Sequence, residues 1–271
     1  MKKTIFASVF TSLLPLVANA GHYTPGVEGI RASVVPGLGL YYKGYAVHYN
    51  ADELSGLSGD NEATINAVAN RLIWVTQSEV LGGNLAFETI IPVIHTDLSI
   101  STPGGIVADD KLGIGDIFLG TVVGWHGERW DTVAGIGVWT ETGQDDDPAD
   151  PGMGYTETML TLGTNIYLND TRDIAFNILS RTSFADDDRD DEFLIEWALS
   201  KQLSSGMEVG LIGYDRWQIE GGNQEKHALG AEVGYFWPQA MTGLNFAAYN
   251  EYDANEDFEG IQLRATLTKV F

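Results

Sequence analysis

Polar and charged side chains recur at alternate positions within several apolar stretches of this sequence. Because successive side chains of a β-strand point to opposite faces, these residues would share one face of a sheet and meet across neighbouring strands. Charges withdrawn from water must be paired, so three glutamates of the set are predicted to pair with its three arginines. The predicted interior set is Asn66, Asn70, Glu88, Asn177, Arg181, Glu196, Arg216, Glu232, Asn245 and Arg264. These groups either line a selective path or simply fill a narrow interior.

Two runs of aspartate are the other concentrated polar feature. They contain Asp145, Asp146, Asp147, Asp186, Asp187 and Asp188. Carboxylate oxygens are ligands that Ca²⁺ and Mg²⁺ prefer, but neither run has the spacing of a twelve-residue calcium loop. Runs of like charge are usually solvated, so no cofactor is assigned and the aspartates stay weak metal candidates.

Hydrolytic chemistry would need a nucleophile and a base held together. His48, His95 and His227 fall at the same end of the predicted strands, where Ser99 or Ser101 could meet them. A histidine in such a position is more often solvated or interfacial. The chain is therefore predicted not to be an enzyme, with an acyl hydrolase at this rim as a third alternative.

The first twenty residues are typical of an export signal. Lys2 and Lys3 precede an apolar run, and residues 18–20 (ANA) offer a small-x-small cleavage site, which places the mature N-terminus at Gly21. The alternative is a short membrane anchor, but the apolar run is too short to span a bilayer.

Composition narrows the class further. The sequence has no cysteine, which excludes a lipid anchor on cysteine, disulfides and thiolate metal sites. After residue 21 no run approaches 18 apolar residues, so no transmembrane helix is predicted. The formal net charge of −23 would repel phosphate backbones, so nucleic acid is not expected as a partner.

The elements that position the polar set are predicted to be strands of alternating character. In residues 193–200, Phe193, Ile195 and Trp197 share one face, while Glu196 and Ala198 share the other. Large apolar residues on one face and small or polar residues on the other are typical of membrane β-strands. A soluble sandwich also alternates, but its small, glycine-rich positions would then face water. The predicted segments are 39–50, 63–76, 84–95, 114–126, 130–141, 155–168, 172–184, 191–203, 206–219, 226–237, 241–252 and 259–271.

The links between these segments alternate in length. Short links such as 81–83 and 127–129 alternate with mostly longer, polar links such as 96–113 and 142–154. Outer-membrane barrels have short periplasmic turns and longer extracellular loops. The sequence therefore predicts an all-β fold: a closed antiparallel transmembrane β-barrel of about 12 strands over residues 39–271, with acidic extracellular loops.

Both ends of the mature chain carry further signs. Residues 21–38 form either a mobile periplasmic tail or a segment that plugs the barrel, and their apolar residues slightly favour docking. The terminal Phe271, after alternating apolar residues, is similar to the signal by which barrel-assembly machinery recognises its clients; Lys269 departs from that pattern. An ordinary strand end is the alternative.

Several stretches resemble one known family. They are residues 21–29 (GHYTPGVEG), 36–42 (PGLGLYY), 115–118 (GDIF), 125–131 (WHGERWD) and 268–271 (TKVF). Together they resemble the outer-membrane transporters of the MetA-pathway of phenol degradation family. The resemblance implies a barrel with a role in passing hydrophobic or aromatic compounds, and it carries no set of substrate-binding residues.

The expected function is that of an outer-membrane channel, porin-like, for passive uptake of small, hydrophobic or aromatic molecules. The alternative is a structural or surface-interaction barrel with a closed lumen. The expected surroundings are the outer membrane of a Gram-negative bacterium, with membrane lipid and lipopolysaccharide against the wall and a small-molecule solute as cargo.

Overall fold

The computed structural model describes residues 21–186, 189–219 and 222–271, so the predicted signal peptide lies outside the described residues. The strands follow the chain as β1 (Gly39–Leu54), β2 (Glu62–Val80), β3 (Gly83–Thr102), β4 (Gly105–Ile114), β5 (Phe118–His126), β6 (Trp130–Trp139), β7 (Glu157–Tyr167), β8 (Ile174–Ala185), β9 (Glu192–Gln202), β10 (Met207–Gln218), β11 (Glu225–Trp237), β12 (Thr242–Asn255) and β13 (Phe258–Val270). A 3₁₀ turn, η3 (Pro238–Ala240), joins β11 to β12. In this described part, no helix is long and apolar enough to cross a bilayer.

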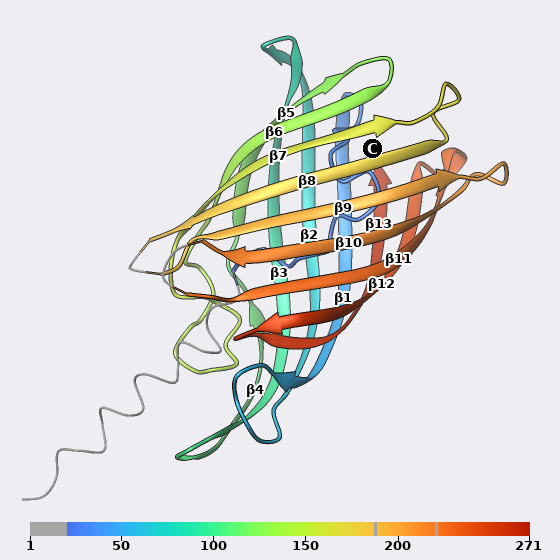
Figure 1. Cartoon of the computed structure of the whole chain (residues 1–271). Helices are drawn as coiled ribbons and strands as arrows, with labels where there is room; N and C mark the ends of the chain where they lie inside the picture. The colour runs from blue at the N-terminus through green and yellow to red at the C-terminus, as the bar shows by residue number, and fades with distance from the viewer. Residues whose placement is uncertain (1–20, 187–188, 220–221) are drawn as a thin grey trace, which may run out of the picture.

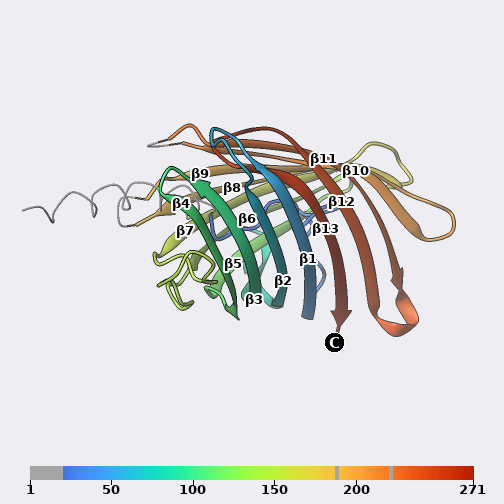
Figure 2. The ribbon, with the colours of Figure 1, turned by 90° about the horizontal axis from the view of Figure 1, so that it is seen from below.

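The strands form one closed antiparallel sheet (Figure 1). Closure occurs between the first and last strands, where Tyr45 of β1 lies opposite Thr266 of β13 and, on its other side, opposite Ala69 of β2. Figure 2 shows these strands side by side along one flank. A closed sheet leaves no free edge for lipid to meet. The predicted closed antiparallel barrel is confirmed. The thirteen strands of the described residues fill twelve positions in the wall, because β4 and β5 share one position.

One position in the wall is shared by two strands. The extracellular half of β3 pairs with β4, and this pairing begins at Val93 opposite Ile114. The periplasmic half of β3 pairs with β5, and that pairing ends at Ile90 opposite Phe118. The wall strand is therefore broken at residues 115–117.

The prediction that residues 96–113 form a loop is wrong, because β3 and β4 continue beyond the barrel as a hairpin. Its inner face carries Leu98 and Ile100, each 3 % exposed, which pack with Leu54 and Ala149. This small apolar cluster stabilises strand pairing in a segment rich in polar residues and glycine, and that composition made the segment resemble a loop.

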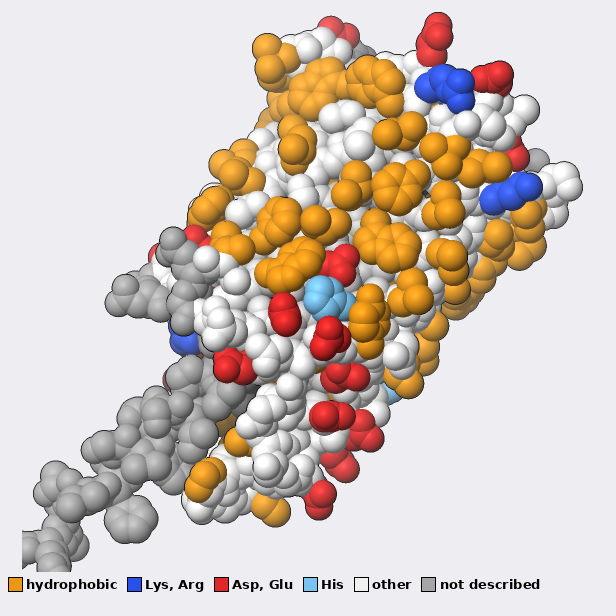
Figure 3. All heavy atoms as spheres, in the orientation of Figure 1, with side chains coloured by type: hydrophobic (Ala, Val, Ile, Leu, Met, Phe, Trp, Pro, Cys, Tyr) orange, Lys and Arg blue, Asp and Glu red, His pale blue; other side chains and the backbone are white. Residues whose placement is uncertain are grey.

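The two faces of the wall alternate as predicted. In β9, Leu194, Glu196 and Ala198 are buried toward the interior, while Ile195 and Trp197 lie on the outer face. Hydrophobic side chains cover most of the outer surface formed by β7–β11, and acidic side chains gather toward one end (Figure 3). This pattern matches an apolar band in contact with acyl chains and polar loops in water.

The two ends of the barrel differ. The end near the C-terminus has tight turns, such as the β2–β3 turn, in which Leu81 and Gly82 both have positive φ (51° and 78°). Two successive positive φ values belong to a type I′ turn, whose twist suits a hairpin. The opposite end carries the longer links, including residues 140–156 and the β3–β4 hairpin (Figure 1).

Residues 21–37, which we call the plug segment, run inside the barrel (Figure 1). Tyr23 and Ile30 pack in a cluster with Ile212 and Tyr214, and Val35 packs in a second cluster nearer the periplasmic end. The barrel interior is thus a packed core made jointly by the wall and the plug segment.

Candidate functional site

The backbone of the plug segment is hydrogen-bonded to side chains of the wall. The nitrogen of Ile30 donates to Glu232 (3.0 Å) and that of Ser33 donates to Asn177 (2.9 Å). Gly29 has φ +63°, and a Cβ there would lie 1.9 Å from a carboxylate oxygen of Glu232. Glycine allows this close approach, so the path of the plug segment is fixed by its sequence.

Glu28 is the charge centre of the plug segment. Its carboxylate pairs with Arg71 of β2, with Arg181 of β8 (3.1 Å) and with Lys43 of β1 (3.4 Å). Burial alone would raise the pKa of Glu28, but the three cations hold it well below its usual range. Glu88 of β3 also pairs with Arg71, so the cluster joins four strands through one plug carboxylate.

Two further wall carboxylates hold the plug segment. Glu196 accepts a hydrogen bond from the Tyr23 hydroxyl (2.5 Å) and Glu232 pairs with Arg264 (2.6 Å). Arg264 in turn donates to the carbonyl of Gly26 (2.8 Å). The wall thus offers donors and acceptors that match the plug segment.

A separate charged network lies in the extracellular half of the lumen. Arg216 pairs with Glu192 (3.3 Å) and with Asp257, and Lys226 pairs with Glu251 (3.2 Å) and Asp257 (3.4 Å). All five side chains are largely buried. Because buried charges are costly unless paired, the network fixes the inner wall here and fills space that a solute would need.

His22 fastens the start of the plug segment at the break in the wall. Its ring nitrogens lie 3.1 Å from Asp116 and 3.2 Å from Glu157, and its ring stacks on Trp139 at 5.7 Å. Burial alone would lower the pKa of His22, but hydrogen bonds to the two carboxylates raise it to about 9. His22 is therefore a cation at neutral pH.

Asp116 also closes the break itself. Its carboxylate accepts hydrogen bonds from the backbone nitrogens of Thr142 and Gly143, both 2.7 Å, and of Met153 (2.8 Å). These residues belong to the link 140–156, which covers the place where β4 is not paired with β6. One side chain thus holds both the covering loop and the plug segment.

The wall beside the break is aromatic and apolar on its inner side. The rings of Phe118 and Trp139 are 5.0 Å apart, and Met159 and Ile90 belong to the same buried cluster. Tyr23 of the plug segment belongs to this cluster, whereas the contact with Trp139 is made by the ion-paired His22 ring. A flat aromatic molecule could replace the apolar part of this contact, provided that His22 stays paired with Asp116 and Glu157.

Most of the residues predicted for the interior do face the lumen. These are Glu88, Asn177, Arg181, Glu196, Arg216, Glu232, Asn245 and Arg264. The predicted set of pairs is only partly present. Glu232 pairs with Arg264, but Glu88 pairs with Arg71, and Arg181 pairs with Glu28.

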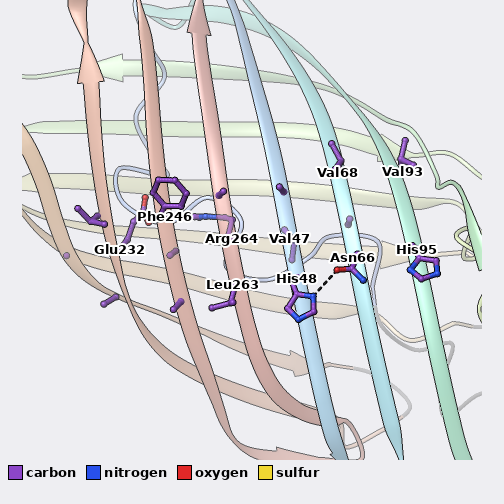
Figure 4. A pocket seen from close by; sticks show the side chains of 18 of the residues that line it. Val47, His48, Asn66, Val68, Val93, His95, Glu232, Phe246, Leu263 and Arg264 are labelled. Atoms are coloured by element: carbon purple, nitrogen blue, oxygen red, sulfur yellow. Dashed lines mark hydrogen bonds and ion pairs between the residues drawn. The ribbon is translucent and has the colours of Figure 1, made fainter.

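The placement of Asn66 and Asn70 in the lumen is wrong. Both point outward from β2 on the face that carries Trp74, which is 57 % exposed. Asn66 lies 2.8 Å from the His48 ring on the outer wall (Figure 4), and Asn70 accepts a hydrogen bond from the Tyr42 hydroxyl. The inner face of β2 carries Ile73 and Val75, which pack with Val35 of the plug segment, beside the buried Arg71, so polarity alone does not mark the inside.

Two aspartates of these runs are engaged by neighbouring segments of the chain. Asp147 pairs with Lys111 (2.7 Å), and Asp186 accepts a hydrogen bond from the Thr156 nitrogen (2.8 Å). Asp187 and Asp188 lie outside the described residues. Within residues 21–186, 189–219 and 222–271, no group of three or more acidic or histidine side chains is arranged to hold a metal ion.

The three rim histidines do not meet: His48 of β1 and His95 of β3 lie on either side of Asn66 of β2, and His227 is on β11. His48 contacts Asn66, while His95 and His227 contact Asp110 (3.3 Å) and Asp215 (2.7 Å) on the outer face. The Ser101 hydroxyl donates to the backbone of Asp60. The arrangement places no serine hydroxyl against these rings in the described part of the chain.

Sequence reasoning missed the charged groups of the plug segment and several of their wall partners. His22, Glu28 and Arg71 are the most consequential. Arg71 stands two positions before the inward-facing Ile73, so it lies on the same face of β2. This spacing could have identified Arg71 as a residue of the lumen. The plug residues follow no strand period, so no sequence pattern could have paired them.

A closed antiparallel barrel with an apolar outer band, tight turns at one end and acidic loops at the other is an outer-membrane β-barrel of a Gram-negative bacterium. The family model "Putative MetA-pathway of phenol degradation" matches residues 34–267, so the chain belongs to that family. This confirms the resemblance and, with the fold, the predicted outer-membrane location.

Solved structures agree on the fold. The COG4313 outer membrane channel from Pseudomonas putida F1 has a TM-score of 0.73 at 16 % identity and covers 92 % of this chain and 100 % of its own. The CymD monoaromatic hydrocarbon channel has a TM-score of 0.50 at 9 % identity, covering 87 % and 89 %. The β domain of the Bordetella autotransporter BrkA has a TM-score of 0.51 at 13 % identity, covering 86 % and 99 %. No curated protein matches the sequence.

Proposed function

We propose that this protein is a passive outer-membrane channel for small aromatic or hydrophobic molecules, which pass when the plug segment shifts from the wall. The observation that carries the proposal is the apolar lining formed by Phe118, Trp139 and Met159 between the wall and the plug segment. The family description and the hydrocarbon channel among the similar structures support the same class of solute.

The charges around this lining explain how such a path would favour aromatic molecules over ions. The lumen keeps its ion pairs on the wall and on the plug segment, with Glu28 and Arg71 buried together. While the plug segment is docked, an ion would compete with these pairs and lose its hydration, whereas an aromatic molecule displaces mainly apolar contact. Once the plug segment has shifted, ions can enter as well, so ionic conductance reports the opening. Passage is diffusive, since the sequence has no phosphate-cradling loop.

A second candidate follows from the same interior. The buried network around Arg216 and Glu251 fills the extracellular half of the lumen, which favours a structural barrel that never opens. This reading predicts no solute flux under any condition.

Uptake by whole cells separates the two, because their outer leaflet slows aromatic molecules. A deletion strain should take up a radiolabelled monoaromatic compound several-fold more slowly than a strain complemented with the wild-type gene. A complementing Phe118→Asp barrel that reaches the outer membrane at the wild-type level should fail to restore uptake. Equal uptake in the deletion and complemented strains would support the closed structural barrel.

A further inference from the structure

A small polar pocket lies beside Gly21 at the extracellular end of the lumen. Its space of about 20 Å³ is large enough for one small polar group. Gly21 and Tyr155 line it, together with these charged residues: Glu157, Arg189, Asp190, Asp191, Glu192 and Arg216. Four of the six charged residues are acidic.

The backbone nitrogen of Gly21 faces the Glu192 carboxylate, which accepts its hydrogen. A Cβ on residue 21 would lie 3.0 Å from one oxygen of Glu192 and 3.2 Å from the other. The carboxylate therefore contacts the first turn of the plug segment, and glycine permits this approach.

The acidic side chains of the pocket outnumber its cations. Arg189 lies over the Tyr155 ring, 5.5 Å from its centre. Arg216 is shared between Glu192 and Asp257, and His22 is shared between Glu157 and Asp116. Glu157 is 2 % exposed, and its Oε1 has no hydrogen-bond partner. A buried carboxylate oxygen without a donor is costly, which indicates that a cationic donor belongs in this pocket.

We propose that the pocket binds the α-ammonium group of the chain's own mature N-terminus. Cleavage of the Ala20–Gly21 peptide bond by an export peptidase consumes one water: the hydroxyl joins the Ala20 carbonyl, and hydrogen joins the Gly21 nitrogen. The resulting amine takes one more proton from solvent and becomes an ammonium with three donors. It pairs with Glu192 and supplies the donor that Glu157 lacks.

The register of the plug segment supports this assignment. Three consecutive residues meet three acidic sites: Gly21 meets Glu192, His22 meets Asp116 and Glu157, and Tyr23 meets Glu196. A mature chain starting at another residue would place its charge elsewhere. The site therefore recognises the processed end of the chain and completes the seating of the plug segment.

The proposal is tested by measuring the pKa of that amine in protein purified from outer membranes. Intact-mass analysis should first show a chain that starts at Gly21. The α-amine should then react with an acylating reagent at pH 7.5 about tenfold more slowly in the folded barrel than in the denatured chain, because ion pairing raises its pKa above the ordinary value of about 8. The pH dependence of labelling should give a raised pKa, whereas simple burial would lower it.

Substitutions test whether Glu192 is the carboxylate that pairs with the amine. Glu192→Gln should lower the amine's pKa and speed labelling, while Glu128→Gln in the periplasmic β5–β6 turn should leave both unchanged. A mature chain starting elsewhere, an ordinary or lowered pKa in the folded wild type, or a Glu192→Gln barrel with unaltered labelling would each overturn the proposal. If Glu192→Gln fails to fold, the wild-type pKa alone decides.

Discussion

At the scale of single residues, Glu28 joins the plug segment to three strands. Its partners Lys43, Arg71 and Arg181 lie on β1, β2 and β8. Removing one partner from a buried ion pair costs about 3–5 kcal/mol, because the other charge stays buried without its counter-ion. We therefore expect Glu28→Gln to lower the free energy of unfolding by about 3 kcal/mol.

Urea unfolding of the detergent-solubilised barrel, followed by tryptophan fluorescence, measures this change. The matched control is Asp170→Asn, whose side chain is 95 % exposed beside Arg129. It should stay within about 0.5 kcal/mol of the wild type. Equal stability of Glu28→Gln and Asp170→Asn would show that Glu28 does not hold the plug segment.

His22 makes the seating of the plug segment depend on pH. Its pKa is raised from 6.5 to about 9 by Asp116 and Glu157, the two charged side chains that the described residues place against the ring, which otherwise packs on Trp139 and Tyr155. A raised pKa in the docked state means that the stabilisation is complete below pH 6.5 and is lost as the pH rises through about 9.

We expect conductance in planar bilayers to rise between pH 7 and pH 10 as His22 loses its proton and the plug segment loosens. His22→Gln should already be more open at pH 6 and should lack this component. An unchanged pH profile in His22→Gln would contradict the assignment, because the response would then belong to other groups.

The choice of ion partners shows how far sequence reasoning reaches at this scale. Alternation places Glu232 and Arg264 on the inner face, and they do pair. Arg181 instead pairs with Glu28, a residue outside every strand. Partner choice depends on a segment whose path is fixed by tertiary contacts, and sequence periodicity carries no information about it.

At the scale of elements, the broken wall strand is the feature that alternation could not predict. The period-2 pattern locates β9 and β5 because their two faces meet lipid and lumen. The β3–β4 hairpin leaves the barrel, so both of its faces depend on local packing around Leu98 and Ile100. The sequence of a strand predicts its faces only where two different environments exist.

Substitution of Asp116 tests how the break in the wall is closed. Its carboxylate accepts three backbone hydrogen bonds from the link 140–156. Asp116→Asn replaces an acceptor oxygen with an N–H group that faces other N–H groups, so the link should loosen. We expect protease added to intact cells to cut residues 140–156 several-fold faster than in the wild type.

The control for that measurement is Asp146→Asn, an exposed aspartate in the same link. Its rate of cleavage should equal that of the wild type. If Asp116→Asn is cut no faster than Asp146→Asn, the break is closed by other contacts, such as the packing of Pro151 against Gly113.

At the scale of the whole molecule, the plug segment and the wall fold as one core. The outer surface is specified by a simple rule, large apolar side chains toward lipid, and the sequence predicts it well. The inner surface is specified by the plug segment, which makes part of the wall apolar inside and misled the placement of Asn66 and Asn70. A path for solutes exists only if this core can open on one side.

Locking the plug segment to the wall tests that requirement most directly. A Cβ built on Gly210 of β10 lies 3.2 Å from Cγ1 of Ile30, and the chain has no cysteine of its own, so Ile30→Cys with Gly210→Cys can form a single disulfide. The same Cβ lies 2.9 Å from the carbonyl oxygen of Leu199, so the Gly210→Cys single variant is the control for a local shift of the wall. Conductance should fall about tenfold when the disulfide forms and should return on reduction to the level of the Ile30→Cys single variant. Equal conductance of the oxidised and reduced double variant, with the disulfide verified by mass, would contradict a path opened by the plug segment.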